Sequence, residues 1–236
     1  MASSYQLKKP NKMTSTNKKV RIIGVLFLLQ ITTAIVSYSV MLDPILYDLN
    51  FIQLLAANEV TVTVAMILDL ICGLSVFGIA VLLFPILKKY NERIALWYVG
   101  LRLNELVTFV IGGVMLLTLL SLSKTYQEAD SSSLDSMAIL AKSLLRARGN
   151  TQDISLFIYC FGTLMFYYLL FQTKLIPRFI SVWGLIGVVL LFVEITANIF
   201  KTSAGGMMIM MPLGLNEIFL GFWLIFKGFD EQRLDA

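Results

Sequence analysis

The chain has 236 residues, of which 58% are hydrophobic and only 14% are charged, and its mean hydropathy is +0.80. Soluble domains carry about 25% charged residues, so this composition excludes a water-soluble globular protein and predicts one that uses the bilayer as its solvent. The formal net charge is +4, and the sequence has no histidine, which removes histidine general bases and histidine-bound zinc or haem.

Residues 1–19 are rich in serine, threonine, asparagine and lysine, a composition typical of disordered tails. The lysines would also suit a nucleic-acid-binding arm. A membrane helix follows at once, however, which favours a basic cytoplasmic flank and predicts no nucleic-acid partner.

Six apolar stretches have a length that suits bilayer crossing, which takes about 20 residues per helix. We therefore expect an all-α fold, a polytopic membrane bundle of six transmembrane helices. The first stretch is too long for a cleaved signal peptide and is interpreted as an anchor. The expected spans are Val20–Met41, Thr61–Leu87, Ile94–Leu122, Ile154–Gln172, Phe179–Phe200 and Pro212–Lys227.

The longest predicted loop covers residues 123–153 and separates two three-helix halves, residues 20–122 and 154–228, with a short cytoplasmic tail at 229–236. Between residues 134 and 148 the apolar side chains fall on one helical face, and Lys142, Arg146 and Arg148 lie off that face. This pattern fits a helix in the membrane interface. It fits a helix packed over the end of the bundle equally well.

A short motif occurs twice, as "LRLNEL" at 101–106 and as "LGLNEI" at 213–218. The third and sixth spans run in opposite directions, so the two copies are antiparallel. Antiparallel copies are expected when two halves are related by an axis in the membrane plane. A short match in a leucine-rich chain also arises by chance, so an inverted repeat of three plus three helices stays one of two alternatives.

Five charged residues fall inside the expected spans: Asp69, Arg102, Glu105, Glu194 and Glu217. A charge at the bilayer centre costs at least about 2.5–3.5 kcal/mol, and such residues usually face the bundle interior. Each acid shares a helical stripe with glycine, which marks faces where membrane helices approach closely. Because four acids face one base, we expect protons or a bound cation to supply the missing positive charge.

These charged residues and three asparagines form the predicted binding site for a small molecule or ion, with no metal or cofactor. We expect Arg102 to pair with Glu217 or Glu194, since an i, i+3 partner such as Glu105 would not join two helices. We also expect the two motifs to meet near the membrane midplane. Glu105 and Glu217 lie roughly 16 Å and 15 Å from the cytoplasmic ends of their helices, and the hydrocarbon core is about 30 Å thick. The predicted site residues are Asp69, Arg102, Asn104, Glu105, Glu194, Asn198, Asn216 and Glu217.

The sequence resembles an uncharacterised family of bacterial six-helix membrane proteins, described only as a domain of unknown function, in "VRIIGVLFLLQITTAI", "LRLNEL", "LIPRFISVWGLIGVVLLF" and "MPLGLNEIFLGFWLIFKGF". The resemblance extends from about Val20 to Gly228, without the long loop. It is most specific around "LIPRFISVWG" and "LGLNEIFLGFWLIFKG". It implies a bacterial inner-membrane protein and supplies no reaction, substrate or catalytic residue.

Two functions agree with these features. A carrier, or a protein that binds a small molecule or ion, would use the buried carboxylates around Arg102, and it predicts a cavity that reaches Glu105 and Glu217. A non-catalytic structural, sensor or accessory subunit would use the same charges only to pair helices, and it predicts dry, paired groups. Enzymatic activity is not expected, since no histidine is present for zinc and Asp69 is the only central aspartate.

Lysines and arginines gather before the first span and in the loops after the second and fourth spans, at residues 88–93 and 174–178. The positive-inside rule places these segments in the cytoplasm. Both termini are therefore predicted to be cytoplasmic, in a multi-pass protein of the bacterial plasma membrane. The expected partners are the lipid bilayer and a small molecule or cation, and the oligomeric state is left open.

Overall fold

The computed structural model describes residues 15–234, and no strand occurs within that range. Six helices are long and apolar enough to cross a membrane, which confirms the all-α bundle of six spans. The helices are α1 Ser15–Ile35, the π-helix η1 Val36–Leu42, α2 Asp43–Leu46, α3 Phe51–Ala57, α4 Glu59–Leu87, α5 Glu92–Glu128, α6 Leu134–Thr173, α7 Arg178–Ile199, α8 Met207–Phe226 and α9 Glu231–Leu234. The predicted tail 1–19 lies mostly outside the described residues.

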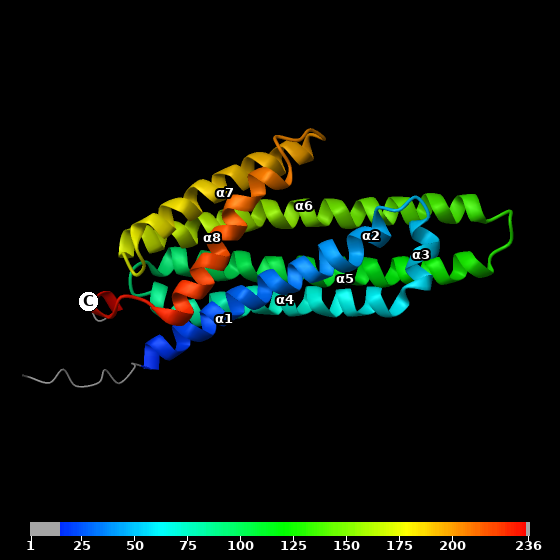
Figure 1. Ribbon diagram of the computed structural model, residues 1–236. Helices are drawn as coiled ribbons and strands as arrows, with labels where there is room; N and C mark the ends of the chain where they lie inside the picture. Colours follow the sequence, from blue (N-terminus) through cyan, green and yellow to red (C-terminus); the bar gives the residue numbers. More distant parts are fainter. Residues whose placement is uncertain (1–14, 235–236) are drawn as a thin grey trace, which may run out of the picture.

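The six spans pack in a ring that follows the order of the chain. Among the described residues, α1 packs on α4, and each later span packs on the next until α8 returns to α1. Both ends of the described chain lie at the same end of the bundle (Figure 1). There the Tyr90 hydroxyl donates to the Arg233 carbonyl at 2.6 Å, and the Asn17 amide donates to Glu231 at 2.6 Å.

The ring order does not fit the inverted repeat that the sequence left open. A two-fold axis in the membrane plane turns one half over. Seen from one side of the membrane, the three helices of the second half would then follow one another around the ring in the direction opposite to that of the first half. Instead the second half continues around the ring in the same sense as the first. The likeness of the two motifs is therefore no sign of such an axis.

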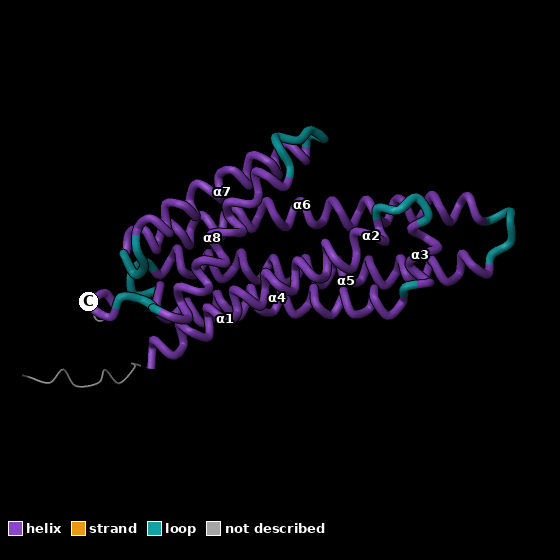
Figure 2. The backbone as a smooth tube through the Cα atoms, viewed as in Figure 1, coloured by secondary structure: helices purple, strands orange, loops and turns teal. Residues whose placement is uncertain are grey.

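The region expected to be a long loop is mostly helix. Between α5 and α6 only a short connection at residues 129–133 is non-helical, and residues 134–148 form the first part of α6, continuous with the fourth span (Figure 2). Residues 134–148 are thus part of a longer helix and not the separate one that both alternatives had assumed. The apolar face of this segment was correctly identified, because Ala141 is buried there and Leu144 and Leu145 are half-buried. Arg148 lies on this face and is buried, contrary to expectation.

Some spans approach one another closely at glycines. A Cβ atom at Gly24 of α1 would lie 2.7 Å from the Gly221 carbonyl oxygen of α8, and one at Gly187 of α7 would lie 2.9 Å from Leu213 Cα. These contacts agree with the predicted glycine faces. Gly112 and Gly214 are different, since a Cβ atom at either would meet nothing within 4 Å.

Candidate functional site

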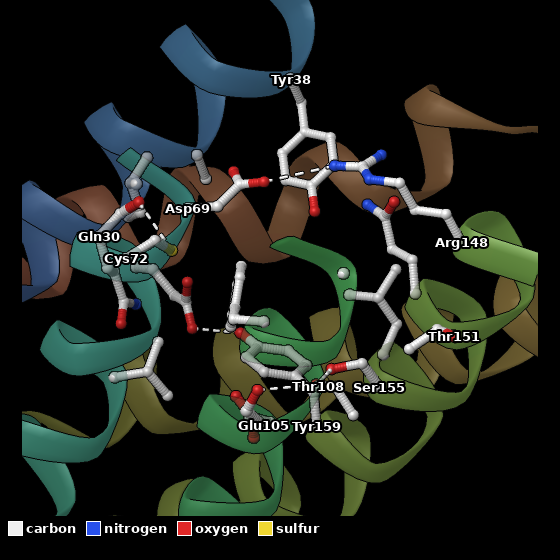
Figure 3. A pocket seen from close by; sticks show the side chains of 18 residues that line it. Gln30, Tyr38, Asp69, Cys72, Glu105, Thr108, Arg148, Thr151, Ser155 and Tyr159 are labelled. Carbon is white, nitrogen blue, oxygen red and sulfur yellow. Dashed lines mark hydrogen bonds and ion pairs between the residues drawn. The ribbon is translucent and has the colours of Figure 1, made fainter. Parts of the chain in front are cut away.

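Asp69 and Arg148 form a buried ion pair that joins α4 to α6. Arg148 Nη2 lies 3.3 Å from Asp69 Oδ2, and the two residues are only 6% and 2% exposed. The Ser37 hydroxyl donates to Asp69 Oδ1 at 2.5 Å, and the Tyr38 ring centroid lies 5.3 Å from Arg148 Cζ. Figure 3 shows Asp69 and Arg148 pointing toward one another with Tyr38 beside them. The sequence prediction included Asp69 but missed the arginine that neutralises it.

The π-helical segment of the first span, Val36–Leu42, carries Ser37 and Tyr38, which both contact this pair. A π-turn widens the helix and changes which residues share its face, and such turns occur frequently at functional sites. Neither residue was among the predicted site residues. Nothing in the sequence pattern distinguishes the π-turn from a continuous α-helix.

Arg102 pairs with Glu105 on its own helix, so the predicted partners, Glu217 and Glu194, were wrong. Its Nη1 donates to the two Glu105 carboxylate oxygens at 3.0 Å and 2.9 Å. Its Nη2 reaches across to α6 and donates to Thr163 Oγ1 at 2.9 Å. The Arg102 guanidinium also packs on two tyrosine rings, 5.1 Å from Tyr98 and 4.7 Å from Tyr159. The Thr163 hydroxyl and the Tyr159 ring, both on α6, therefore make the contacts between helices that an acid was expected to make.

Glu217 of α8 has no cation within 4.0 Å among the described residues, although it is only 7% exposed. Its Oε1 accepts a short hydrogen bond from the Tyr159 hydroxyl, the only hydrogen bond of this side chain within residues 15–234. Tyr159 thus contacts both Glu217, through its hydroxyl, and Arg102, through its ring. Glu217 is therefore a buried carboxylate that forms no ion pair within residues 15–234.

Glu194 and Asn198 lie away from these groups and hold the turn between α7 and α8. Glu194 accepts from the Ser203 hydroxyl and from the Ala204 backbone N–H, each at 3.0 Å. When the Asn198 side-chain amide is assigned with its nitrogen facing Glu194, this nitrogen donates to Glu194 Oε1 at 3.3 Å and to the Thr202 carbonyl at 3.2 Å. These two predicted site residues therefore do not belong to the cluster around Arg102.

The two motif asparagines play different parts. Asn216 is fully buried and its amide donates to the Ile180 carbonyl at 3.0 Å, which connects α8 to α7. Polar contacts of this kind stabilise the packing of membrane helices. The Asn104 Nδ2 atom, by contrast, has no hydrogen-bond partner within the described part of the chain.

A cavity of about 260 Å³ lies between the spans and brings the remaining acids together. Asp69, Glu105 and Glu217 all line it, as does Arg148, so the two motifs do meet at one site. The residues of α7 do not contribute to its lining. The other residues that line the cavity are Gln30, Ile31, Ala34, Tyr38, Cys72, Val76, Thr108, Phe109, Gly112, Thr151, Gln152, Ser155, Leu156 and Tyr159.

The charges around the cavity leave one carboxylate in excess. Asp69 is balanced by Arg148, and Glu105 is balanced by Arg102, which reaches Glu105 from the same helix. Glu217 has no such counter-charge in residues 15–234. No three or more cysteine or carboxylate side chains of this range are grouped so that they could hold a metal ion. The arrangement is therefore suited to a single positive charge placed beside Glu217.

The model of a family described as a domain of unknown function, DUF4386, matches residues 22–228. No curated protein and no solved structure matches the chain.

Proposed function

The chain belongs to the DUF4386 family, whose description assigns no function, and we propose that it binds a small, positively charged organic molecule in the cavity between its membrane spans. The observation that carries this proposal is Glu217, a buried carboxylate that lines the cavity without a basic partner among the described residues. A ligand cation would supply the missing charge.

The volume and lining of the cavity limit the ligand. Pockets for drug-sized molecules measure about 300–1,000 Å³, so a cavity of about 260 Å³ suits a smaller molecule. Much of the wall is apolar, including Ile31, Val76, Phe109 and Leu156. A ligand with an apolar body and one charged end matches this wall better than a hydrated metal cation does.

Aromatic rings in the wall of the cavity also favour a cationic group. Tyr159 donates to Glu217 and its ring packs on Arg102, Tyr38 packs on Arg148, and Phe109 lines the same cavity. Ammonium groups are attracted to the faces of such rings by about 0.5–2 kcal/mol, with the larger values at desolvated sites. Carboxylate and rings together therefore provide both charge and surface for an organic ammonium ion.

The proposal is tested with three probes that share one apolar body: phenylbutylamine, phenylbutanol and phenylbutanoate. The measurement is the thermal unfolding temperature of the purified protein in neutral detergent. The amine should raise this temperature, the alcohol should raise it less, and the carboxylate should leave it unchanged. Glu217→Gln should weaken amine binding by roughly 10- to 100-fold, which corresponds to one lost charge-assisted hydrogen bond.

The matched control is Glu194→Gln, which neutralises a buried acid that does not line the cavity. It should leave the amine-induced shift in place. Equal stabilisation by all three probes would show that the cavity is an apolar site without charge selection. A shift that survives Glu217→Gln would contradict the assignment of this residue.

A structural or accessory subunit remains the second candidate, and the two complete ion pairs favour it. Asp69 with Arg148 joins α4 to α6, and Arg102 with Thr163 joins α5 to α6, as expected of groups that serve to fix helices. This function predicts that no probe shifts the unfolding temperature. Catalysis is not part of either proposal, because the chain lacks histidine and Asp69 is paired.

The proposed orientation places both termini in the cytoplasm of a bacterial cell, in its inner membrane. It is supported by the basic residues of the tail and of the loops at the end of the bundle where the termini lie. A cysteine that replaces Ser132 should react with an impermeant thiol reagent in intact cells. Reaction only after lysis would reverse the orientation.

A further inference from the structure

A second cavity, of about 540 Å³, lies at the end of the bundle where both termini lie. It is bounded by the turn between α6 and α7 and by the segment that follows α8. The Asp230 backbone N–H donates to the Leu175 carbonyl at 3.0 Å, which holds these two segments together. Leu175 and Phe229 are buried, so the cavity has a packed apolar base.

The wall of this second cavity is strongly basic. Lys174, Arg178, Lys227 and Arg233 line it, with Asp230 as the one acidic side chain. No carboxylate lies within 4.0 Å of any of the four basic groups within residues 15–234. Four cations gathered around one cavity repel one another unless an anion lies between them. The cluster is thus arranged to receive a negatively charged group.

The local backbone places one of these cations at a conformation that lysine rarely adopts. Lys174 ends α6 with φ 56°, in the left-handed region where glycine is usual, and its N–H donates to the Leu170 carbonyl at 3.1 Å. A lysine in such a position carries a cost that glycine would not. This conformation ends α6 at Lys174, and the lysine lines the cavity.

We infer that this cavity binds the phosphate group of an anionic membrane lipid. Basic pockets between membrane helices on the cytoplasmic side bind such headgroups. Trp223 lines the cavity, and tryptophan is enriched at the level of the headgroups. The Arg178 guanidinium lies 5.2 Å from the Phe171 ring centroid, so it packs on the last turn of α6 beside the cavity. Arginine binds phosphate through two parallel hydrogen bonds.

The test measures thermal unfolding of the whole chain in neutral detergent after addition of phosphatidylglycerol, phosphatidylcholine or inorganic phosphate at constant ionic strength. Phosphatidylglycerol should stabilise the protein, and the other two should not. The double variant Lys227→Gln, Arg233→Gln should bind phosphatidylglycerol roughly 30-fold more weakly, since each basic residue contributes about 1 kcal/mol. Stabilisation should also fall as salt shortens the Debye length from about 10 Å at 0.1 M to about 3 Å at 1 M.

The matched control is Lys88→Gln, Arg93→Gln, which removes the same charge near the same end of the bundle, outside the cavity. It should keep the full lipid-induced shift. Equal loss in both double variants would mean that only total charge matters and would overturn the site. A cavity-dependent shift with inorganic phosphate alone would overturn the lipid as its source. Without lipid, both double variants should unfold at the same temperature as the unmodified protein, because the four substituted side chains are exposed.

Discussion

The two buried arginine–carboxylate pairs of this protein differ in what they connect. Arg148 and Asp69 come from α6 and α4, so their attraction holds two spans together. Arg102 and Glu105 both come from α5, and the connection to α6 is made by Thr163 and Tyr159. A charge pair within a membrane span is therefore not by itself a connection between helices. The other contacts of the arginine decide which neighbouring helix the pair is connected to.

The two pairs also differ in whether a neighbouring carboxylate is left without an ion-pair partner. The Asp69 pair is complete, with Ser37 and Tyr38 around it. Because Arg102 is paired with Glu105, Glu217 is left with a tyrosine hydroxyl and with no cation within 4.0 Å in the described chain. An intrahelical pair on α5 thus leaves the acid of the neighbouring motif unneutralised at the cavity. This is the origin of the proposed binding site.

The largest effect on stability is expected from Arg148→Met. Breaking a buried pair leaves Asp69 without its cation, which costs about 3–5 kcal/mol of unfolding free energy. The measurement is unfolding of the purified protein in mixed micelles at increasing denaturing detergent. Arg146→Met is the control, because Arg146 is exposed two positions earlier, and its change should stay within about 0.5 kcal/mol. Equal losses for the two variants would remove the interhelical pair from the account of stability.

Arg102→Lys should have a smaller effect. Lysine keeps the charge beside Glu105 but lacks the planar fork that also reaches Thr163, so about 1–3 kcal/mol should be lost. Thr163→Val removes the same contact from α6. In a double-mutant cycle the two losses should overlap, since both delete one hydrogen bond. Fully additive losses would show that Arg102 does not act on α6 through Thr163.

Gly24→Ala tests how α8, which carries Glu217, is held without any ion pair in the described chain. The new methyl group would lie 2.7 Å from the Gly221 carbonyl oxygen, so α1 and α8 must separate, at a cost of about 1–3 kcal/mol. Gly214→Ala is the control on α8, since nothing lies within 4 Å of its added carbon. If the two variants unfold alike, close packing of α1 on α8 is not what holds this span.

The smallest effect is expected from Asn216→Leu, which deletes the hydrogen bond from α8 to the Ile180 carbonyl. Hydrogen bonds between membrane helices contribute about 0.6 kcal/mol on average. Asn104→Leu, at the corresponding position of the other motif, should cost nothing, because the Asn104 Nδ2 atom has no partner in the described residues. A larger loss from Asn104→Leu would reveal a role for that asparagine.

The spans, and the meeting of Glu105 with Glu217, could be predicted from the sequence. Hydrophobic length determines where a helix crosses a bilayer, and an ionised side chain there must point inward. The partner of Arg102 could not be predicted, because helical faces are known from spacing while the rotation of one span against another depends on packing. The partners of Glu194 could not be predicted either, because they lie in the turn that follows its own helix.

Arg148 shows a different kind of error, since its signal was present in the sequence. It follows Ala141, Leu144 and Leu145 at helical spacing on the apolar face, where a charged residue indicates a buried partner. The prediction that Arg148 lies off this face concealed the signal. The π-helical segment around Ser37 had no such signal, because α- and π-turns accept the same apolar sequence.

The most direct test of ligand binding beside Glu217 is an experimental structure of the protein with an iodinated phenylalkylamine. The iodine should mark the apolar wall of the cavity near Phe109, and the ammonium group should lie within about 4 Å of the Glu217 carboxylate, the usual limit for an ion pair. An amine found only in the detergent around the spans, with the cavity closed over Tyr159 and Glu217, would contradict the proposed function.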